Sequence, residues 1–345
     1  MLSDNKYKLS LPCNYNYPED AALFKKSFFK LPKQKVLTLR NALLTHNGLV
    51  FKENILPVWK SFYFHNSHFG NQLYRGFLEN LVSRYGRNTP PVKLSKKFDY
   101  LSIHTPWFNY YHWIEDSLTR LFLLDYNNLE DYVLILPEEY KTVSFVEETL
   151  KNFRFKGIEW LSTGQHALIP NLIFPEQRVF CPNYNPSTVL NLQSFFFEKY
   201  MVDINSKKGK RIYIGRKNAR RIIQNENEVI SVLKSFDFEI HYFENSSFKE
   251  QIKLISDAII LVSPHGAALT NINFMKKGSK VLELHKRVTN KNDHHSKVYY
   301  HLANTLNLKY YHQLCEPVNP EMDFFESDLI VDIKKLNDNI LHMIS

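Results

Sequence analysis

Cysteine is scarce in this chain of 345 residues, and the three that occur, Cys13, Cys181 and Cys315, lie far apart. They form neither a metal-binding spacing nor an even disulfide set, so a reducing compartment is expected. The sequence also has no run of the roughly 20 apolar residues that would cross a bilayer, and its amino-terminal segment lacks the pattern of a secretory signal. We therefore expect a cytoplasmic protein that could contact the inner face of a membrane through its basic surface.

Two catalytic signatures are also missing. The absence of a Gly-x-Ser-x-Gly elbow argues against a serine hydrolase. No convincing Asp-x-Asp follows a predicted strand, so the usual carboxylate clamp for a divalent cation is not visible. Asp293, His294 and His295, with His301 nearby, invite a metal interpretation, but adjacent histidines on a helix would point in divergent directions. We expect no bound metal and no cofactor.

Apolar and basic residues are plentiful. Hydrophobic residues make up 44% of the chain and aromatic residues 14%, enough to give two domains a sizeable core each. Lys and Arg number 44 against 35 Asp and Glu, which gives a net charge of +9. This excess favours an anionic partner such as a nucleotide sugar, a lipid pyrophosphate, a membrane surface or nucleic acid, without choosing among them. The oligomeric state is left open.

The first half of the chain has the pattern of an α/β domain. Apolar alternation on both sides of Asn47-Gly48 predicts a hairpin of residues 36–44 and 49–55. Further strands are expected near residues 100–103, 132–136, 158–161 and 167–174, with helices near 111–124 and 143–153. Such alternation is typical of a mixed α/β layer structure. We assign residues 1–190 to this domain.

The second half alternates more regularly and predicts a parallel, doubly wound sheet of the Rossmann type. The expected strands cover residues 211–215, 238–243, 258–262, 280–284 and 308–312, and the expected helices cover 226–235, 248–257, 266–275 and 295–306. Asn225 with Glu228, and Ser247 with Glu250, have the spacing of a helix capping box. We assign residues 191–325 to this domain and 326–345 to a helical segment that could pack back on the N-terminal domain.

Residues 258–285, AIILVSPHGAALTNINFMKKGSKVLELH, join an apolar strand to a turn of small residues. The turn at His265, Gly266 and Ala267 opens a predicted helix, whose first N–H groups have no internal partner and can bind an anion. We expect a phosphate to approach the backbone there, although small residues also simply allow a helix to pack on a sheet. Glu283, in the next buried strand, needs a polar partner, and a ribose diol is one candidate.

Arginines follow the strand at residues 211–215. The carboxyl end of a strand in a doubly wound sheet is where ligands bind. Arg216, with Arg220 or Arg221, could therefore clamp a diphosphate and stabilise a departing nucleotide. The same residues could equally form a basic surface loop or contact nucleic acid phosphates.

A third group lies on the helix predicted over residues 111–124. His112 and Asp116 share its polar face, and a carboxylate beside an imidazole can act as a general base toward a hydroxyl. A solvated or interdomain face would have the same pattern. The aromatic residues around Trp107 and Trp113 suit carbohydrate and suit a core equally well.

Together these segments resemble glycosyltransferase family 61, in order and spacing over roughly residues 36 to 312. The matching pieces are His112-Trp113-Ile114-Glu115-Asp116 with Arg120-Leu121, Tyr213-Ile214-Gly215-Arg216, Arg221 to Asn225-Glu226-Asn227-Glu228, Phe248-Lys249-Glu250-Gln251-Ile252, His265-Gly266-Ala267-Ala268-Leu269-Thr270-Asn271 and Val281-Leu282-Glu283-Leu284. Gly215 replaces the Ser that many relatives have before the Arg.

The resemblance implies a GT-B fold, in which two Rossmann-like domains face a central cleft. It also implies an inverting hexosyl- or pentosyltransferase that moves a sugar from a nucleoside diphosphate, such as UDP, to an acceptor hydroxyl without a metal. The missing secretory signal suggests a bacterial-type enzyme of capsular or lipopolysaccharide synthesis, with a glycan or lipid-linked glycan as acceptor.

The resemblance also implies roles for individual residues. Arg216 and Arg221 would hold the diphosphate, the turn from His265 to Ala267 would lie against it, and Glu283 would take the ribose. Asp116 would be the base, with Glu115 as the competitor and His112 as an orienting partner. Two alternatives remain open: a module that binds nucleic acid or another polyanion without catalysis, and a degenerate transferase that serves as an assembly partner. We prefer an enzyme to a binding module, and we expect that it does not bind nucleic acid.

Overall fold

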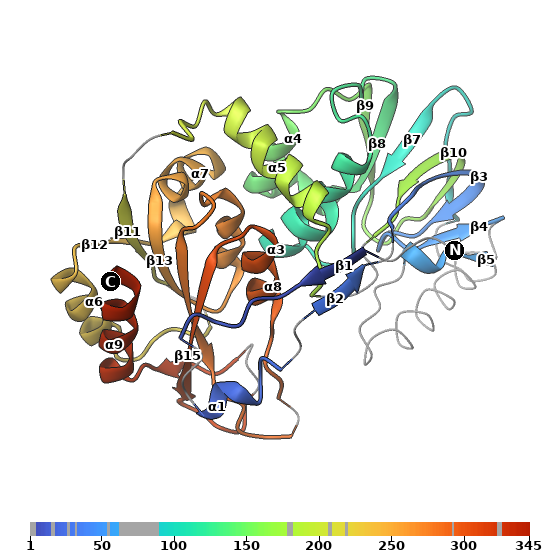
Figure 1. The fold of residues 1–345 in the computed structure, drawn as a ribbon. Helices are drawn as coiled ribbons and strands as arrows, with labels where there is room; N and C mark the ends of the chain where they lie inside the picture. The colour runs from blue at the N-terminus through green and yellow to red at the C-terminus, as the bar shows by residue number, and fades with distance from the viewer. Residues whose placement is uncertain are drawn as a thin grey trace. The chain divides into compact units, whose positions relative to one another are not determined.

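The computed structural model describes residues 5–14, 18–25, 28–31, 33–53, 56–61, 90–177, 182–205, 209–217, 220–291, 293–322 and 326–345. The chain forms two compact units (Figure 1). Unit 1 comprises Met1–Asn5 and Leu31–Leu192, and unit 2 comprises Lys6–Lys30 and Gln193–Ser345. The main division thus falls between residues 192 and 193, where the expected boundary was between residues 190 and 191. Residues 6–30 nevertheless belong to unit 2, where Asn14 donates to the carbonyl oxygen of His312 at 2.5 Å.

The described part of unit 1 is built on a mixed sheet in the order β5-β4-β3-β10-β7-β8-β9, with β6 also paired to β10. Its strands are β3 (Val36–Leu44), β4 (Val50–Lys52), β5 (Leu56–Pro57), β6 (Val92–Lys93), β7 (Asp99–Ser102), β8 (Tyr132–Pro137), β9 (Gly157–Leu161) and β10 (Ala167–Pro175). The expected hairpin is confirmed: β3 and β4 pair antiparallel, and Gly48 takes a φ of 81° in the turn. Strands β10, β7, β8 and β9 pair in parallel.

Among the described residues of unit 1, the helical segments are short apart from the last one. They are η1 (Trp59–Ser61), α3 (Tyr110–His112), the π-helical η2 (Trp113–Ser117), the 3₁₀-helical η3 (Leu118–Leu123), η4 (Glu138–Thr142), α4 (Ser144–Leu150) and α5 (Pro186–Lys199), the last of which continues into unit 2. The single helix expected over residues 111–124 is therefore a succession of α, π and 3₁₀ turns. The π turn matters for the site, because such turns displace the side chains that follow them.

Unit 2 contains the predicted parallel sheet, in the order β12-β11-β13-β14-β15-β16. Its strands are β11 (Lys210–Ile214), β12 (Phe238–His241), β13 (Ala258–Pro264), β14 (Lys280–Lys286), β15 (Lys309–Pro317) and β16 (Leu329–Ile330). All neighbouring pairs are parallel except β15 with β16, which is antiparallel. A separate two-stranded sheet joins β1 (Asn5–Lys8) to β2 (Phe28–Leu31).

The helical segments of unit 2 are α1 (Pro18–Ala21), α6 (Glu226–Ser235), η5 (Phe243–Asn245), α7 (Phe248–Ser256), η6 (Ala267–Phe274), α8 (Val298–Thr305) and α9 (Ile333–Ile344). The helix expected over 266–275 is thus the 3₁₀ helix η6. The capping box at Ser247 and Glu250 is confirmed, whereas the expected cap at Asn225 is wrong. The amide of Asn225 instead bonds both the N–H and the carbonyl oxygen of Val331.

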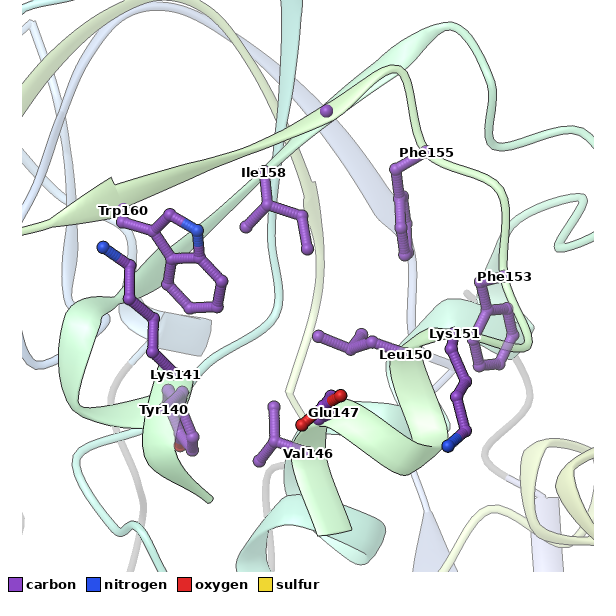
Figure 2. A pocket seen from close by; sticks show the side chains of 11 residues that line it. Tyr140, Lys141, Val146, Glu147, Leu150, Lys151, Phe153, Phe155, Ile158 and Trp160 are labelled. Atoms are coloured by element: carbon purple, nitrogen blue, oxygen red, sulfur yellow. The ribbon is translucent and has the colours of Figure 1, made fainter. Parts of the chain in front are cut away.

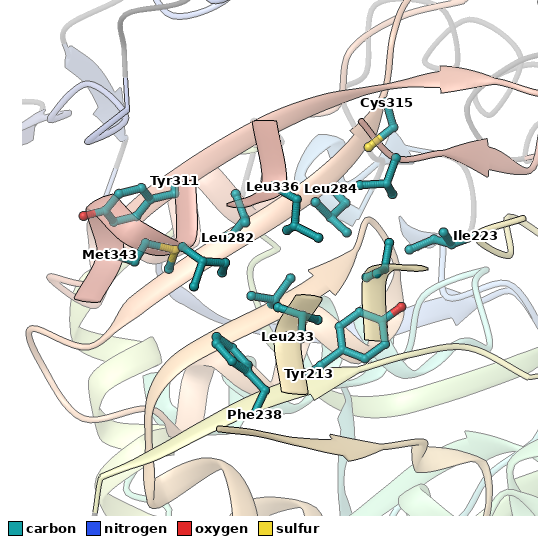
Figure 3. Close-up of a cluster of buried hydrophobic side chains, with 14 of the residues drawn as sticks. Tyr213, Ile223, Leu233, Phe238, Leu282, Leu284, Tyr311, Cys315, Leu336 and Met343 are labelled. Carbon is teal, nitrogen blue, oxygen red and sulfur yellow. The ribbon is translucent and has the colours of Figure 1, made fainter. Parts of the chain in front are cut away.

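One face of the unit 2 sheet carries an apolar core (Figure 3). Leu282 and Leu284 of β14 face it, together with Leu233 of α6 and Leu336 of α9. The carboxyl-terminal helix packs on this core of unit 2, because its buried stripe completes it, and its Asn339 and Lys335 also bond Asn14 and Glu19 near the amino terminus. Strand side chains alternate, so Glu283 and the neighbouring His285 point to the opposite face. In the described part of the chain, no helix is long and apolar enough to span a bilayer.

Candidate functional site

The carboxyl end of β11 delivers Arg216 to the turn after β13. Its Nη1 donates to the carbonyl oxygen of Arg220 at 2.8 Å, and its Nη2 donates to the carbonyl oxygen of His265 at 3.4 Å. Burial lowers the pKa of Arg216 from its usual value. The guanidinium is thus held by backbone oxygens at the edge of a parallel sheet where anionic ligands bind.

A side chain at Gly266 would displace the guanidinium of Arg216. A Cβ built on Gly266 would lie 1.7 Å from Nη2 of Arg216, which is far inside van der Waals contact. The backbone of Gly266 is extended, with φ of 163°, so the absence of a side chain matters here for space. We expected a phosphate to use that space, and the arginine occupies it. Ala267, partly buried, starts η6 beside it.

The side chains of Arg221 and Arg220 have different surroundings from each other. Arg221 takes the left-handed φ of 64°, and its charge helps to lower the pKa of His265, after the larger effect of burial. The side chain of Arg220 is 75% exposed and lies 3.6 Å from Glu326. The structure therefore associates Arg216 and Arg221 with the His265 turn, while the guanidinium of Arg220 pairs with a carboxylate elsewhere in unit 2.

Glu283 is completely buried beneath the same turn. One carboxyl oxygen contacts Nδ1 of His265, and the other accepts from the hydroxyl of Tyr310 at 2.6 Å. Burial raises the pKa of Glu283 and lowers that of His265 well below its usual value, which favours a pair without net charge. In this arrangement Glu283 positions His265, and a contact with ribose would require one of these partners to move.

More histidines gather behind Glu283. The rings of His285 and His295 stack with centroids 4.0 Å apart, and Nε2 of His295 lies 2.8 Å from Nε2 of His312. His312 Nδ1 lies 3.1 Å from Asp20 Oδ1, which ties α1 to the sheet. Burial lowers the pKa values of His285 and His295 well below normal. This cluster was not predicted, although Glu283 and His285 at alternate positions of the buried strand β14 were a signal for it in the sequence.

Metal ligation is geometrically conceivable at one place among the described residues. The ligand atoms of His265, Glu283 and His285 lie within 4.8 Å of one another. However, His265 and Glu283 already contact each other, and the charges of Arg216 and Arg221 act on His265, which disfavours a further cation. The other histidines of the sequence motif are dispersed, because Asp293 pairs with Lys286 at 2.5 Å and His295 turns to His312.

Unit 1 brings His112 and Asp116 together across the π turn. Nδ1 of His112 contacts Oδ2 of Asp116, whose side chain is only 1% exposed against 18% for His112. Trp107 stacks on the imidazole with centroids 4.7 Å apart. We expected the carboxylate of Asp116 to act on the acceptor as the base. In the structure the imidazole of His112 is the more exposed side chain of the pair.

Glu115 is buried next to this pair. It lines a water-sized cavity of about 10 Å³ together with Asp116 and Arg120. Arg120 is fully buried and donates to the carbonyl oxygens of Ser102, Ile103 and Pro175, at 3.1, 2.7 and 2.7 Å. Burial lowers its pKa to about 9. Arg120 therefore anchors the helical segment to the ends of β7 and β10, a role that we did not predict.

A larger pocket of about 380 Å³ lies in unit 1 between η4, α4 and β9 (Figure 2). Trp160, Phe155 and Phe153 present aromatic surface to it, and Glu147 and Lys141 supply polar groups. Tyr140 forms part of its wall and donates to the carbonyl oxygen of Trp107 at 3.4 Å. The backbone of Trp107, the residue whose ring stacks on His112, is thus hydrogen-bonded to a residue of this pocket.

A comparison with protein families matches the glycosyltransferase 61 family over residues 110–282, which is half of the chain. The match includes the His112–Asp116 pair, Arg216, Arg221 and the His265–Gly266 turn, and it ends immediately before Glu283. No curated protein matches the chain. Because the matched segment contains both groups of polar residues described above, we conclude that the chain belongs to the glycosyltransferase 61 family.

Proposed function

We propose that the protein is an inverting, metal-independent glycosyltransferase that uses a nucleoside diphosphate sugar, with UDP as the expected nucleotide. The observation that carries this proposal is Arg216, held by the carbonyl oxygens of Arg220 and His265 at the carboxyl edge of the unit 2 sheet. A fixed guanidinium matches the geometry of a phosphate and stabilises the negative charge of a leaving diphosphate. Family membership supports the sugar transfer itself.

On the acceptor side we propose that His112 and Asp116 act together. The acceptor hydroxyl oxygen attacks the anomeric carbon, the bond from that carbon to the diphosphate oxygen breaks, and its electron pair leaves with the nucleotide. The hydroxyl proton passes to Nε2 of His112, while Asp116 holds Nδ1. This refines the expectation that Asp116 is the base, because Asp116 is the buried member of the pair.

The aromatic pocket of unit 1 is our proposed site for the sugar residues of a glycan or lipid-linked glycan acceptor. Aromatic faces and a few polar groups are the usual lining of small-molecule pockets, and about 380 Å³ is in the usual range. We place the enzyme in the cytoplasm, in cell-surface polysaccharide synthesis. The GT-B arrangement of the two units belongs to the same proposal and is supported by the α/β architecture of each unit.

UDP should bind without a divalent ion, and Arg216→Ala should weaken that binding by about 1.5–3 kcal/mol, the scale of a charge-assisted hydrogen bond. Titration calorimetry with and without EDTA measures both effects. Arg220→Ala is the matched control, because its guanidinium is exposed and pairs with Glu326, and it should change the affinity much less. A strict requirement for manganese or magnesium would contradict the proposal.

Glu283→Gln separates the two roles considered for this carboxylate. If Glu283 positions the His265 turn, the variant should weaken the binding of UDP and of inorganic diphosphate by the same factor, because the turn and Arg216 serve both ligands. If Glu283 binds the ribose, only UDP should lose affinity. Competition between the two ligands, measured by calorimetry, distinguishes these outcomes, and Tyr310→Phe provides a second perturbation of the same carboxylate.

A further inference from the structure

The edge of the unit 2 sheet opposite the Arg216 site gathers cations. Strands β11, β13, β14 and β15 are parallel, so their amino ends share one edge. Lys280 and Lys309 begin β14 and β15 and are register partners, and Arg211 lies at the start of β11. The turn before β14 adds Lys276 and Lys277. This edge is therefore basic at the end of the sheet that the proposed donor does not use.

Carboxylates on this edge are fewer. Asp257 directly precedes β13 at this edge, Asp237 lies 3.9 Å from Arg211, and Glu239 pairs with Lys210 at 3.1 Å. Apart from the Lys210–Glu239 pair, this edge thus holds two carboxylates, Asp237 and Asp257, and five cations, so its net charge is positive. The cations are Arg211, Lys276, Lys277, Lys280 and Lys309, and the ammonium of Lys280 also donates to the carbonyl oxygen of Met343. Charge of one sign on one edge favours an anionic surface as the partner.

Exposed aliphatic side chains accompany these cations. Ile259 of β13 is 44% exposed, and the last turn of α9 presents Leu341 and Ile344, which are 47% and 37% exposed. Ile259 and Ile344 line a hollow of about 480 Å³ together with Arg211, Lys276, Lys277 and Lys280. Phosphates of nucleic acid would be matched by the cations alone, and the aliphatic groups would gain nothing from them. Apolar side chains among lysines are the combination that binds an interface of lipid headgroups and acyl chains.

We propose that this edge, defined by Arg211, Ile259, Lys276, Lys277, Lys280 and Ile344, is a docking surface for an anionic lipid bilayer. The lysines and the arginine bind lipid phosphates, and Ile259 and Ile344 enter the headgroup layer. Docking through the amino ends of the strands leaves the carboxyl ends, with Arg216 and the His265 turn, away from the lipid. The inference is independent of the proposed catalytic chemistry.

Flotation with lipid vesicles tests this surface. The full chain should float with vesicles in which about a third of the lipid is phosphatidylglycerol, and it should remain in solution with pure phosphatidylcholine. Lys276→Glu with Lys277→Glu should weaken the binding at least about tenfold, because two attractive charges become repulsive. Ile259→Ser should weaken it while leaving the net charge unchanged. Circular dichroism and melting temperature establish that each variant is folded.

The matched control is Lys96→Glu with Lys97→Glu, which changes the net charge equally at exposed positions of unit 1. This control should bind vesicles like the parent chain. Equal losses in both double variants would overturn the proposal, because binding would then follow total charge alone. Equal binding of the parent chain to both kinds of vesicle would also overturn the proposal. So would a parent chain that does not bind vesicles but binds a single-stranded oligonucleotide, if the Lys276 and Lys277 double variant loses that binding.

Discussion

Asp116→Asn and His112→Gln should each lower the rate of sugar transfer by about 10²-fold to 10⁴-fold, the usual contribution of general base catalysis. The two effects should be similar, because the imidazole accepts the proton and the carboxylate fixes its orientation through Nδ1. Both variants should bind UDP like the parent, since the pair lies in unit 1 and the diphosphate residues lie in unit 2. Release of UDP from the donor in the presence of acceptor gives the rate, and calorimetry gives the affinity.

Glu115→Gln is the control for this pair. Glu115 is also buried, and it lines the water-sized cavity beside Asp116. The variant therefore shows the effect of replacing a buried carboxylate by an amide while the contact between His112 and Asp116 is kept. We expect it to retain most of the activity. If Asp116 were itself the base, His112→Gln would be much milder than Asp116→Asn. Parental rates in both variants would mean that the pair is structural and that the base lies elsewhere.

Stability should fall steeply in acid because unit 2 buries neutral imidazoles. The pKa values of His265, His285 and His295 are all lowered by burial, so below about pH 6.5 the unfolded chain takes up protons that the native state does not. Each such group removes about 1.4 kcal/mol of stability per pH unit. Above that pH all three are neutral in both states, and their contribution is fully present.

Glu283 acts in the opposite direction. Burial raises its pKa above the usual value of 4.5, so in the interval between 4.5 and the raised value the native state holds a proton that the unfolded chain lacks. Within that interval one of these three proton uptakes is offset, and the four groups together remove about 2.7 kcal/mol per pH unit. Burial also lowers the pKa values of His104 and His166 in unit 1, which adds to the loss in the same direction. The melting temperature should therefore drop markedly between about pH 7 and pH 5.

Calorimetric melting at a series of pH values measures this dependence. His295→Gln should reduce the slope by about one proton, or about 1.4 kcal/mol per pH unit, because one buried imidazole is removed. His342→Gln is the matched histidine replacement at an exposed position of α9, and both variants are melted over the same pH series. A melting temperature that stays constant over this range would show that the imidazoles are already protonated in the native state.

Local patterns predicted the elements of unit 2 well. Continuous apolar runs identified β13 and β14, helix periodicity gave α6 over Glu226–Ser235 as expected, and the Ser247–Glu250 spacing marked a genuine capping box. These features depend on residues that are neighbours in the sequence. The predicted helix cap at Asn225 was wrong, because its side chain bonds the backbone of Val331, which is distant in the sequence.

The candidate site was predictable only in part. The family resemblance placed Arg216 and the turn at His265 and Gly266 around one diphosphate, but it could not show that the arginine itself fills the space above the glycine. That contact joins residues 50 positions apart, and the hydrogen bond from Arg216 to His265 joins residues 49 positions apart. The pairing of His112 with Asp116 was visible from helical spacing, whereas their relative exposure depends on how the segment packs against unit 1.

The π turn of η2 makes the geometry of unit 1 sensitive to chain length. Leu118 N donates to the carbonyl oxygens of both Trp113 and Ile114, so the turn accommodates one more residue than an α-helical turn. Deleting one residue here would restore an ordinary helix and rotate everything that follows by about 100°. Arg120 would then leave the carbonyl oxygens of β7 and β10, or the imidazole and the carboxylate would separate. Insertions and deletions should thus be excluded from this segment in active relatives, even where substitutions are tolerated.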